Sequence, residues 1–258
     1  MPQPPADFSR RVIDHDGKSR PVLVTGSAGP AVVAIHEIYG VTPELIRFAR
    51  WVRDAGFRVY LPVLYGRDDG EAETKPDLGQ LIKICVSREF VLFADGKTSP
   101  IVEWLKAVAR TAHAECGGKG VGVIGMCLSG NFALSMAVEP VVLAPVAAQP
   151  GLPVNKPGGL GISPGDLDVV QRRVREEGLQ VRGYRFAGDD LCRAARFEAY
   201  QRALGDGFTG TVLPDEAGNP AGRNPPHSVF TGDLIDAAGE PTRKAVDEVI
   251  GFFRAKLG

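Results

Sequence analysis

The sequence has few of the residues that build metal centres and disulfide frameworks. Its 258 residues include four histidines and four cysteines, namely Cys85, Cys116, Cys127 and Cys192. No two cysteines have the C-x-x-C spacing of zinc ribbons and thioredoxin-like redox motifs. His36-Glu37 lacks the second histidine of a zinc-protease helix, and no other cluster has metal-ligand spacing. We therefore expect no disulfide framework, no metal and no cofactor.

An excess of charge of one sign and long apolar runs are also missing. Thirty basic and thirty-one acidic side chains give a net charge of −1, which provides no overall field for nucleic acid or an anionic membrane. No apolar run approaches the roughly 18 residues of a membrane span. Residues 1–7, Met-Pro-Gln-Pro-Pro-Ala-Asp, lack the basic and apolar regions of a signal peptide. We expect a small-molecule partner and a cytoplasmic location, without nucleic acid or membrane.

The composition is that of an ordinary globular domain. Apolar residues make up 44% and charged residues 24% of the chain, which is enough to bury a core and excludes disordered, collagen-like and coiled-coil chains. The length suits one large α/β domain, and no long linker or internal repeat divides it. We expect residues 1–258 to form a single domain, as a monomer or a small homo-oligomer.

Short apolar segments alternate with helical patterns along the chain. Strands are expected at residues 21–25, 31–36, 58–61, 120–125, 141–147, 180–187 and 209–213. Helices are expected at 42–55, 78–93, 101–114, 131–138, 163–177, 192–204 and 242–256. This alternation predicts an α/β fold with a mainly parallel central sheet and helices on both faces. Two long polar connections, 62–79 and 214–226, are candidate site walls or lids.

The most informative segment is Gly125-Met126-Cys127-Leu128-Ser129, which joins a buried strand to a helix. It indicates a nucleophile elbow, in which the nucleophile occupies a strained turn and the residues two before and two after it must be small. Gly125 and Ser129 meet this requirement. The start of the next helix favours thiolate character at Cys127 and a developing oxyanion. A buried packing role is the alternative for this cysteine.

A cysteine nucleophile needs a base, and the base needs an acid to orient it. His227 follows the last strand, where the chain order nucleophile, acid, histidine of the α/β-hydrolase fold places the base. The acid is expected after an intervening strand, at Gly188-Asp189-Asp190. We expect Asp190 to be the acid, because capping the next helix is the commonest role of an aspartate such as Asp189 at this kind of turn. The reverse assignment stays open.

Five short motifs, taken together and in order, resemble the dienelactone hydrolases, which are cysteine members of the α/β-hydrolase fold. They are residues 36–40, 64–67, 125–130, 188–190 and 227–228, and the resemblance extends from about residue 21 to residue 253. It implies the α/β-hydrolase fold and a triad of Cys127, Asp190 and His227. It also implies that Glu37 holds the cysteine at rest and releases it when substrate arrives. Without the resemblance, the expected role of Glu37 is that of a salt-bridge partner or of a carboxylate that interacts with a helix dipole.

The resemblance further implies an oxyanion hole made by the backbone N–H groups of Ile38 and Leu128. The expected substrate-binding residues are Tyr39, Tyr65 and Arg67, which follow two of the strands. The implied activity is hydrolysis of a small ester or lactone through a thioester acyl-enzyme.

One position departs from the family. In dienelactone hydrolases an arginine four residues after the histidine helps to hold the substrate carboxylate, and here that position is Thr231. Arg67 and Arg223, on the two long loops, are alternative candidates for binding a carboxylate. The identity of the substrate therefore stays open.

Two other functions must be considered. Residues 120–125 match G-x-G-x-x-G, the fingerprint of dinucleotide-dependent oxidoreductases, but the glycines lie inside the expected strand and Glu139 precedes the next strand instead of ending it. The second is a catalytically silent protein that binds a carbonyl ligand on the same fold, because a fold does not guarantee its chemistry.

Overall fold

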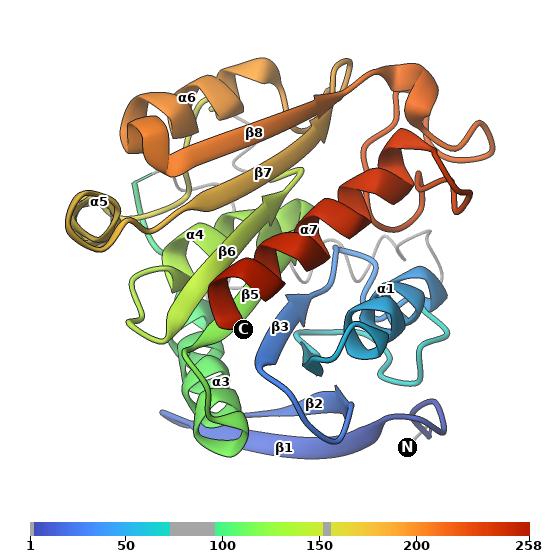
Figure 1. Cartoon of the computed structure of the whole chain (residues 1–258), viewed down its shortest axis with the longest axis vertical. Coiled ribbons are helices and arrows are strands. Elements are labelled where there is room, and N and C mark those ends of the chain that lie inside the picture. The colour runs from blue at the N-terminus through green and yellow to red at the C-terminus, as the bar shows by residue number, and fades with distance from the viewer. Residues whose placement is uncertain (1–2, 73–95, 152–155) are drawn as a thin grey trace.

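The protein is built around one mostly parallel sheet (Figure 1), and the structure, a computed structural model, describes residues 3–72, 96–151 and 156–258. The eight strands are β1 (Ser9–His15), β2 (Lys18–Thr25), β3 (Ala31–Ile35), β4 (Arg58–Pro62), β5 (Val121–Met126), β6 (Val142–Ala148), β7 (Val181–Phe186) and β8 (Phe208–Leu213). Their order is β1-β2-β4-β3-β5-β6-β7-β8. The pairs β1–β2 and β2–β4 are antiparallel and the others are parallel. The predicted fold class is confirmed.

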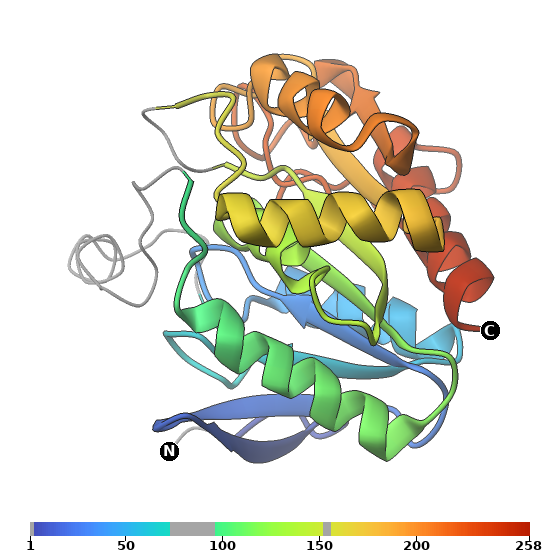
Figure 2. The ribbon, with the colours of Figure 1, turned by 90° about the vertical axis from the view of Figure 1, so that its left-hand side faces the viewer.

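Helices cover both faces of this sheet (Figure 2). They are α1 (Pro43–Asp54), α3 (Ile101–Cys116), α4 (Gly130–Met136), α5 (Pro164–Glu177), α6 (Ala194–Leu204) and α7 (Pro241–Leu257). α1 and α7 share one buried cluster, whereas α3 to α6 contribute to the clusters of the opposite face. The predicted helix at 78–93 and Cys85 lie outside the described residues. In the part of the chain that is described, no helix has both the length and the apolar character needed to cross a membrane.

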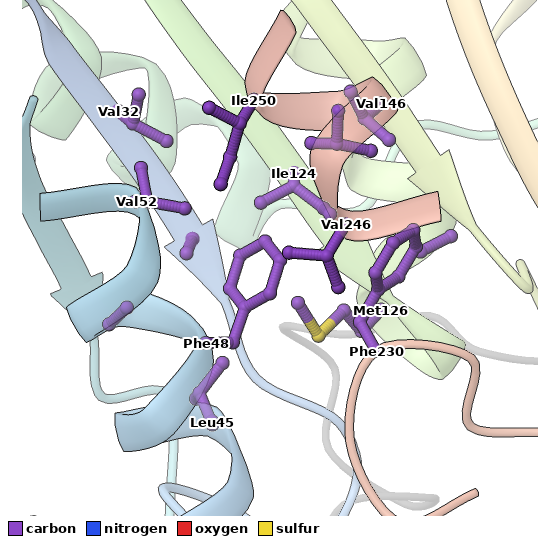
Figure 3. Packing of buried hydrophobic residues seen from close by; sticks show 14 of the residues in the cluster. Val32, Leu45, Phe48, Val52, Ile124, Met126, Val146, Phe230, Val246 and Ile250 are labelled. Atoms are coloured by element: carbon purple, nitrogen blue, oxygen red, sulfur yellow. The ribbon is translucent and has the colours of Figure 1, made fainter. Parts of the chain in front are cut away.

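The central strands are apolar at every position because both of their faces are covered. In β3, Val32 and Ala34 pack on the α1 and α7 side, and Val33 and Ile35 pack on the α3 side. β5 divides its side chains in the same way. Figure 3 shows its Ile124 and Met126 in the cluster with Phe48 of α1 and Val246 of α7. The strand that leads to Cys127 is thus fixed from both sides.

The glycines of the G-x-G-x-x-G match have packing roles. Gly122 lies inside β5, and a Cβ there would lie 2.8 Å from Cδ1 of Phe253 on α7. Gly120 precedes the strand, and its Cβ would lie 2.5 Å from the Val141 carbonyl oxygen. Neither forms the strand-to-helix turn that a dinucleotide pyrophosphate requires.

The sequence did not predict β1, which is the edge strand of the sheet. Its sequence, Ser-Arg-Arg-Val-Ile-Asp-His, is mostly polar, and only Ile13 is buried. The strand pairs with β2 through the turn at Asp16 and Gly17, both of which have positive φ. An edge strand with one covered face needs few apolar residues, so it gives little periodic signal.

The strand order places a site at the carboxyl ends of β3 and β5. From β3 the chain continues to β4 on one side, and β5 lies on the other side. In open α/β sheets such a reversal opens a crevice beyond the strand ends, where ligands bind. The loop at residues 36–41 and the turn at Cys127 both begin there.

Candidate active site

Cys127 occupies a tight turn directly after β5. Its φ is 57°, which L-residues rarely adopt, and a short 3₁₀ turn (Cys127–Ser129) leads into α4. A Cβ on Gly125 would lie 2.0 Å from the carbonyl oxygen of Ser129, so the residue two before the cysteine must be glycine. Cys127 as a whole residue is 9% exposed. This backbone has the geometry expected of a nucleophile elbow.

His227 is held beside the cysteine by its own loop. The Oδ2 atom of Asp233 accepts hydrogen bonds from the backbone N–H groups of His227 and Ser228, each at 2.7 Å. Cys127 Sγ and His227 Cε1 both lie 3.6 Å from the point where a Cβ on Gly151 would stand. The sulfur and the imidazole are therefore neighbours around Gly151.

The aspartate that contacts the imidazole is Asp189, so the prediction of Asp190 is corrected. Asp189 is 3% exposed, and its Oδ2 lies 2.7 Å from His227 Nδ1. Asp190 is exposed and forms a 2.8 Å ion pair with Arg223. Asp189 does not cap α6, whose N-cap is Arg193 without a side-chain cap, but holds the turn that precedes this helix. Its Oδ1 accepts the N–H groups of Leu191 and Cys192 at 2.9 and 3.0 Å.

The surroundings of the imidazole favour its protonated form. Burial alone would lower the pKa of His227, but the neighbouring Cys127 sulfur and the Asp189 carboxylate outweigh it, and the pKa lies well above its ordinary value. The other ring nitrogen, Nε2, is buried and has no hydrogen-bond partner of ordinary length in the described part of the chain.

Glu37 lies at the end of β3 in a buried network of polar side chains. Its carboxylate accepts hydrogen bonds from Ser228 Oγ at 2.8 Å, from Gln149 Nε2 at 3.2 Å and from the Thr231 hydroxyl. Burial raises the pKa of this carboxyl. Among the described residues, the hydrogen-bond partners of this carboxylate are these three side chains, and the interaction with Cys127 that the resemblance implied is not one of them. The network has no sequence signature, because Thr231 is 194 positions from Glu37.

Ser129 connects the elbow to the loop that follows β3. Its buried hydroxyl accepts the N–H of Met126 at 2.8 Å and lies 3.0 Å from the carbonyl oxygens of Ile35 and His36. The loop with Ile38 is thereby held against the turn with Leu128, so the structure brings together the two segments expected to supply the oxyanion N–H groups.

The predicted substrate-binding residues separate into different environments. Tyr65 donates its hydroxyl to the Glu37 carbonyl oxygen at 3.1 Å. Arg67 pairs with Asp69 on its own loop. Arg223 pairs with Asp190 and donates to the Pro225 carbonyl oxygen. Residues 73–79 of the first long loop lie outside the described residues.

Tyr39 and Glu37 line a cavity of about 570 Å³. Ser228, Thr231 and Arg223 also line it. Thr231 thus lies beside Glu37 in the wall of this cavity. In the described ranges, no three or more histidine, cysteine, aspartate or glutamate side chains converge as metal ligands would.

Comparison with known structures agrees with this fold. A dienelactone hydrolase-like promiscuous phosphotriesterase from metagenomic libraries aligns with a TM-score of 0.64 at 18% identity, over 98% of this chain and 100% of the other. A cold-adapted esterase from an Arctic intertidal metagenomic library aligns with a TM-score of 0.62 at 15% identity, over 99% and 97%. At these identities the likeness concerns the fold alone.

Sequence comparison gives the family. A carboxymethylenebutenolidase from a Pseudomonas species is 34% identical over 113 residues, which is 43% of this chain and 45% of that protein. Carboxymethylenebutenolidase 1 from Cupriavidus pinatubonensis is 30% identical over 118 residues, 45% and 48% of the two chains. The matches thus span about half the length of these relatives. The sequence profile of the dienelactone hydrolase family matches residues 21–158, more than half of the chain, and the protein belongs to that family.

Proposed function

We propose that this protein hydrolyses a small ester or lactone with Cys127 as nucleophile, His227 as general acid and base, and Asp189 as the residue that orients the imidazole. The observation that carries the proposal is the 2.7 Å contact between Asp189 and His227, with Cys127 beside the ring on a positive-φ turn. Family membership and the names of the two curated relatives support a lactone or ester as substrate.

In the first half of the reaction, the Cys127 sulfur attacks the carbonyl carbon and the carbonyl oxygen becomes an oxyanion. The N–H groups of Ile38 and Leu128 donate hydrogen bonds to that oxyanion. When the tetrahedral intermediate collapses, the C–O bond breaks and Nε2 of His227 gives its proton to the leaving alkoxide. The products are a thioester and an alcohol, which stays attached to the acyl group if the substrate is a lactone.

In the second half, the neutral imidazole removes a proton from water, and the oxygen attacks the thioester carbonyl. Collapse of this intermediate breaks the C–S bond and returns the sulfur to Cys127, and the carboxylic acid leaves. Asp189 keeps the remaining proton on Nδ1 throughout and stabilises the imidazolium. Nε2 is thereby reserved for the reacting groups.

The proposed substrate is an ester or lactone whose recognition differs from that of the dienelactone hydrolases. Thr231 stands where those enzymes have an arginine, and its hydroxyl is bonded to Glu37. Arg67 and Arg223, the expected substitutes, are each paired with an aspartate. A neutral substrate therefore suits this site better than a carboxylate.

The test is a screen of lactones, short aryl esters and thioesters against the wild type, Cys127→Ala and Cys116→Ala. Cys116 is a half-buried cysteine at the end of α3, next to Tyr60, and serves as the matched control. We expect every hydrolytic activity to disappear in Cys127→Ala and to persist in Cys116→Ala. Hydrolysis that survives the loss of Cys127 would overturn the proposal, and so would a wild type that binds carbonyl ligands without turnover.

A further inference from the structure

The peptide bond between Glu37 and Ile38 is held by two side chains that the proposed reaction does not use. The Glu37 carbonyl oxygen lies 2.7 Å from Nδ1 of His36 and 3.1 Å from the hydroxyl of Tyr65. The rings of His36 and Tyr65 meet edge to face with centroids 4.7 Å apart. The backbone N–H of Gly40 donates to the same oxygen at 3.1 Å, so two side chains and one backbone group converge on it.

A carbonyl held in this way fixes the N–H on the other side of the same peptide. The six atoms of a peptide unit are coplanar, and in the trans form the C=O and N–H bonds point in opposite directions. Among the described residues the only cis bond is Asn224–Pro225, so the Glu37–Ile38 unit is trans. The direction of the Ile38 N–H is consequently set by what holds the Glu37 carbonyl.

The histidine of this pair has a fixed tautomer. The backbone N–H of Leu64 donates to His36 Nε2 at 3.0 Å, so the ring hydrogen resides on Nδ1 and points at the Glu37 oxygen. His36 is 1% exposed, and burial lowers its pKa to about 4. The ring is therefore neutral at physiological pH and bridges the loop after β4 to the loop after β3.

We propose that His36 and Tyr65 are positioning residues that aim the Ile38 N–H at the oxyanion of the ester or lactone. The inference rests on the proposed function. It assigns Tyr65 to the support of the oxyanion hole instead of to direct substrate binding. Hydrogen bonds to a carbonyl also polarise the attached N–H, so the pair strengthens the donor as well as orienting it.

The test compares Tyr65→Phe with Tyr60→Phe, using the best ester or lactone found in the screen. Both substitutions remove a phenol hydroxyl that donates a hydrogen bond, but Tyr60 bonds to Glu115, away from the site. Loss of a whole oxyanion donor lowers kcat by about 10²- to 10³-fold. Loss of one of the three hydrogen bonds that hold the Glu37 carbonyl is expected to lower kcat by up to about tenfold, with KM little changed, while Tyr60→Phe behaves like the wild type.

Alkylation of Cys127 by iodoacetamide separates this role from general disturbance of the site, because the reaction forms no oxyanion. We expect Tyr65→Phe to be alkylated at the wild-type rate although its kcat is reduced. His36→Gln provides a second variant, with a larger loss of kcat and the same alkylation rate.

Three results would overturn the inference. An unchanged kcat in Tyr65→Phe and His36→Gln would show that the hydrogen bonds of these side chains to the Glu37 carbonyl do not affect turnover. Alkylation slowed as much as kcat shows that the cysteine, and not the oxyanion peptide, was disturbed. Full hydrolysis by Cys127→Ala removes the proposed function itself and this inference with it.

Discussion

At the scale of single residues, the two carboxylate oxygens of Asp189 have separate tasks. One oxygen caps the turn before α6, and the other contacts the imidazole of His227. A hydrogen-bonded turn restrains the side chain, so the oxygen that faces the histidine is already in place before substrate binds. Asp190 is adjacent in sequence but its side chain is directed to solvent and to Arg223.

Replacing each aspartate by asparagine should therefore have very different effects on turnover. In Asp189→Asn the imidazole loses its charge partner and its fixed tautomer, and kcat is expected to fall by about 10²- to 10⁴-fold. Asp190→Asn is the matched control and loses only an exposed ion pair, so its kcat should be nearly that of the wild type. Steady-state kinetics on one aryl ester measure kcat of both variants. A larger loss of kcat in Asp190→Asn than in Asp189→Asn would identify Asp190 as the acid.

A second residue-scale expectation concerns the buried carboxylate of Glu37. Thr231→Val removes one of its hydrogen-bond donors at nearly constant volume. A buried acceptor that loses a donor destabilises the folded state by about 1–3 kcal/mol. Thr209→Val, on the exposed face of β8, is the control and should change the free energy of unfolding by less than about 0.5 kcal/mol. Urea denaturation measures the free energy of unfolding of both variants. A Thr231→Val variant as stable as Thr209→Val would contradict the stabilising role of the Glu37 network.

At the scale of elements, the turn after β5 depends on the absence of a side chain at Gly125. The carbonyl oxygen of Ser129 occupies the space that a Cβ would need. The turn also depends on the packing of Met126 beneath it, among residues of α1 and α7 (Figure 3).

Gly125→Ala should consequently disrupt the elbow, with a loss of stability of about 3 kcal/mol or more and no measurable turnover. Gly251→Ala is the matched control, because Gly251 lies on the exposed face of α7 with no atom near its Cβ position. This second change should stabilise the protein by about 0.5–1 kcal/mol. Thermal unfolding and ester hydrolysis of the two variants provide the comparison, and a fully active Gly125→Ala would refute the steric argument.

Much of the element order was predictable because it depends on local periodicity. Strands with two covered faces, such as β3 and β5, are apolar throughout. The start of α1 is indicated by Thr42 at its N-cap and Pro43 at its first position. The turn at Cys127 was predictable because it joins a buried strand to a helix. His227 was predicted from the chain order of the α/β-hydrolase fold, which places the base after the last strand. The direction in which the adjacent side chains of Asp189 and Asp190 point could not be predicted, because local periodicity does not determine it. Contacts between segments distant in sequence, such as Glu37 with Thr231, could not be predicted for the same reason.

At the scale of the whole molecule, the buried histidine of the β3 loop couples stability to pH. The pKa of His36 is lowered from 6.5 to about 4 in the folded state, so between these values the unfolded chain binds more protons. The contribution of His36 to stability is therefore complete above pH 6.5 and is lost as the pH falls towards 4. The shift corresponds to about 3 kcal/mol in total.

His36→Gln cannot take up this proton, so its free energy of unfolding should fall less steeply than that of the wild type between pH 6.5 and 4. Above pH 7 the two slopes should coincide, which serves as the internal control. Denaturation at several pH values measures the slopes. Parallel curves over the whole range would show that His36 is not the group that titrates.

The loop at residues 117–119 lies at the end of β5 opposite to Cys127. Gly117 and Gly118 are exposed, follow the last turn of α3, and have no atom near the places where side chains would stand. The six residues of β5 put about 20 Å between this loop and Cys127. A tether to a resin, an electrode or a second enzyme at residues 117–119 would thus be attached at the end of β5 opposite to Cys127.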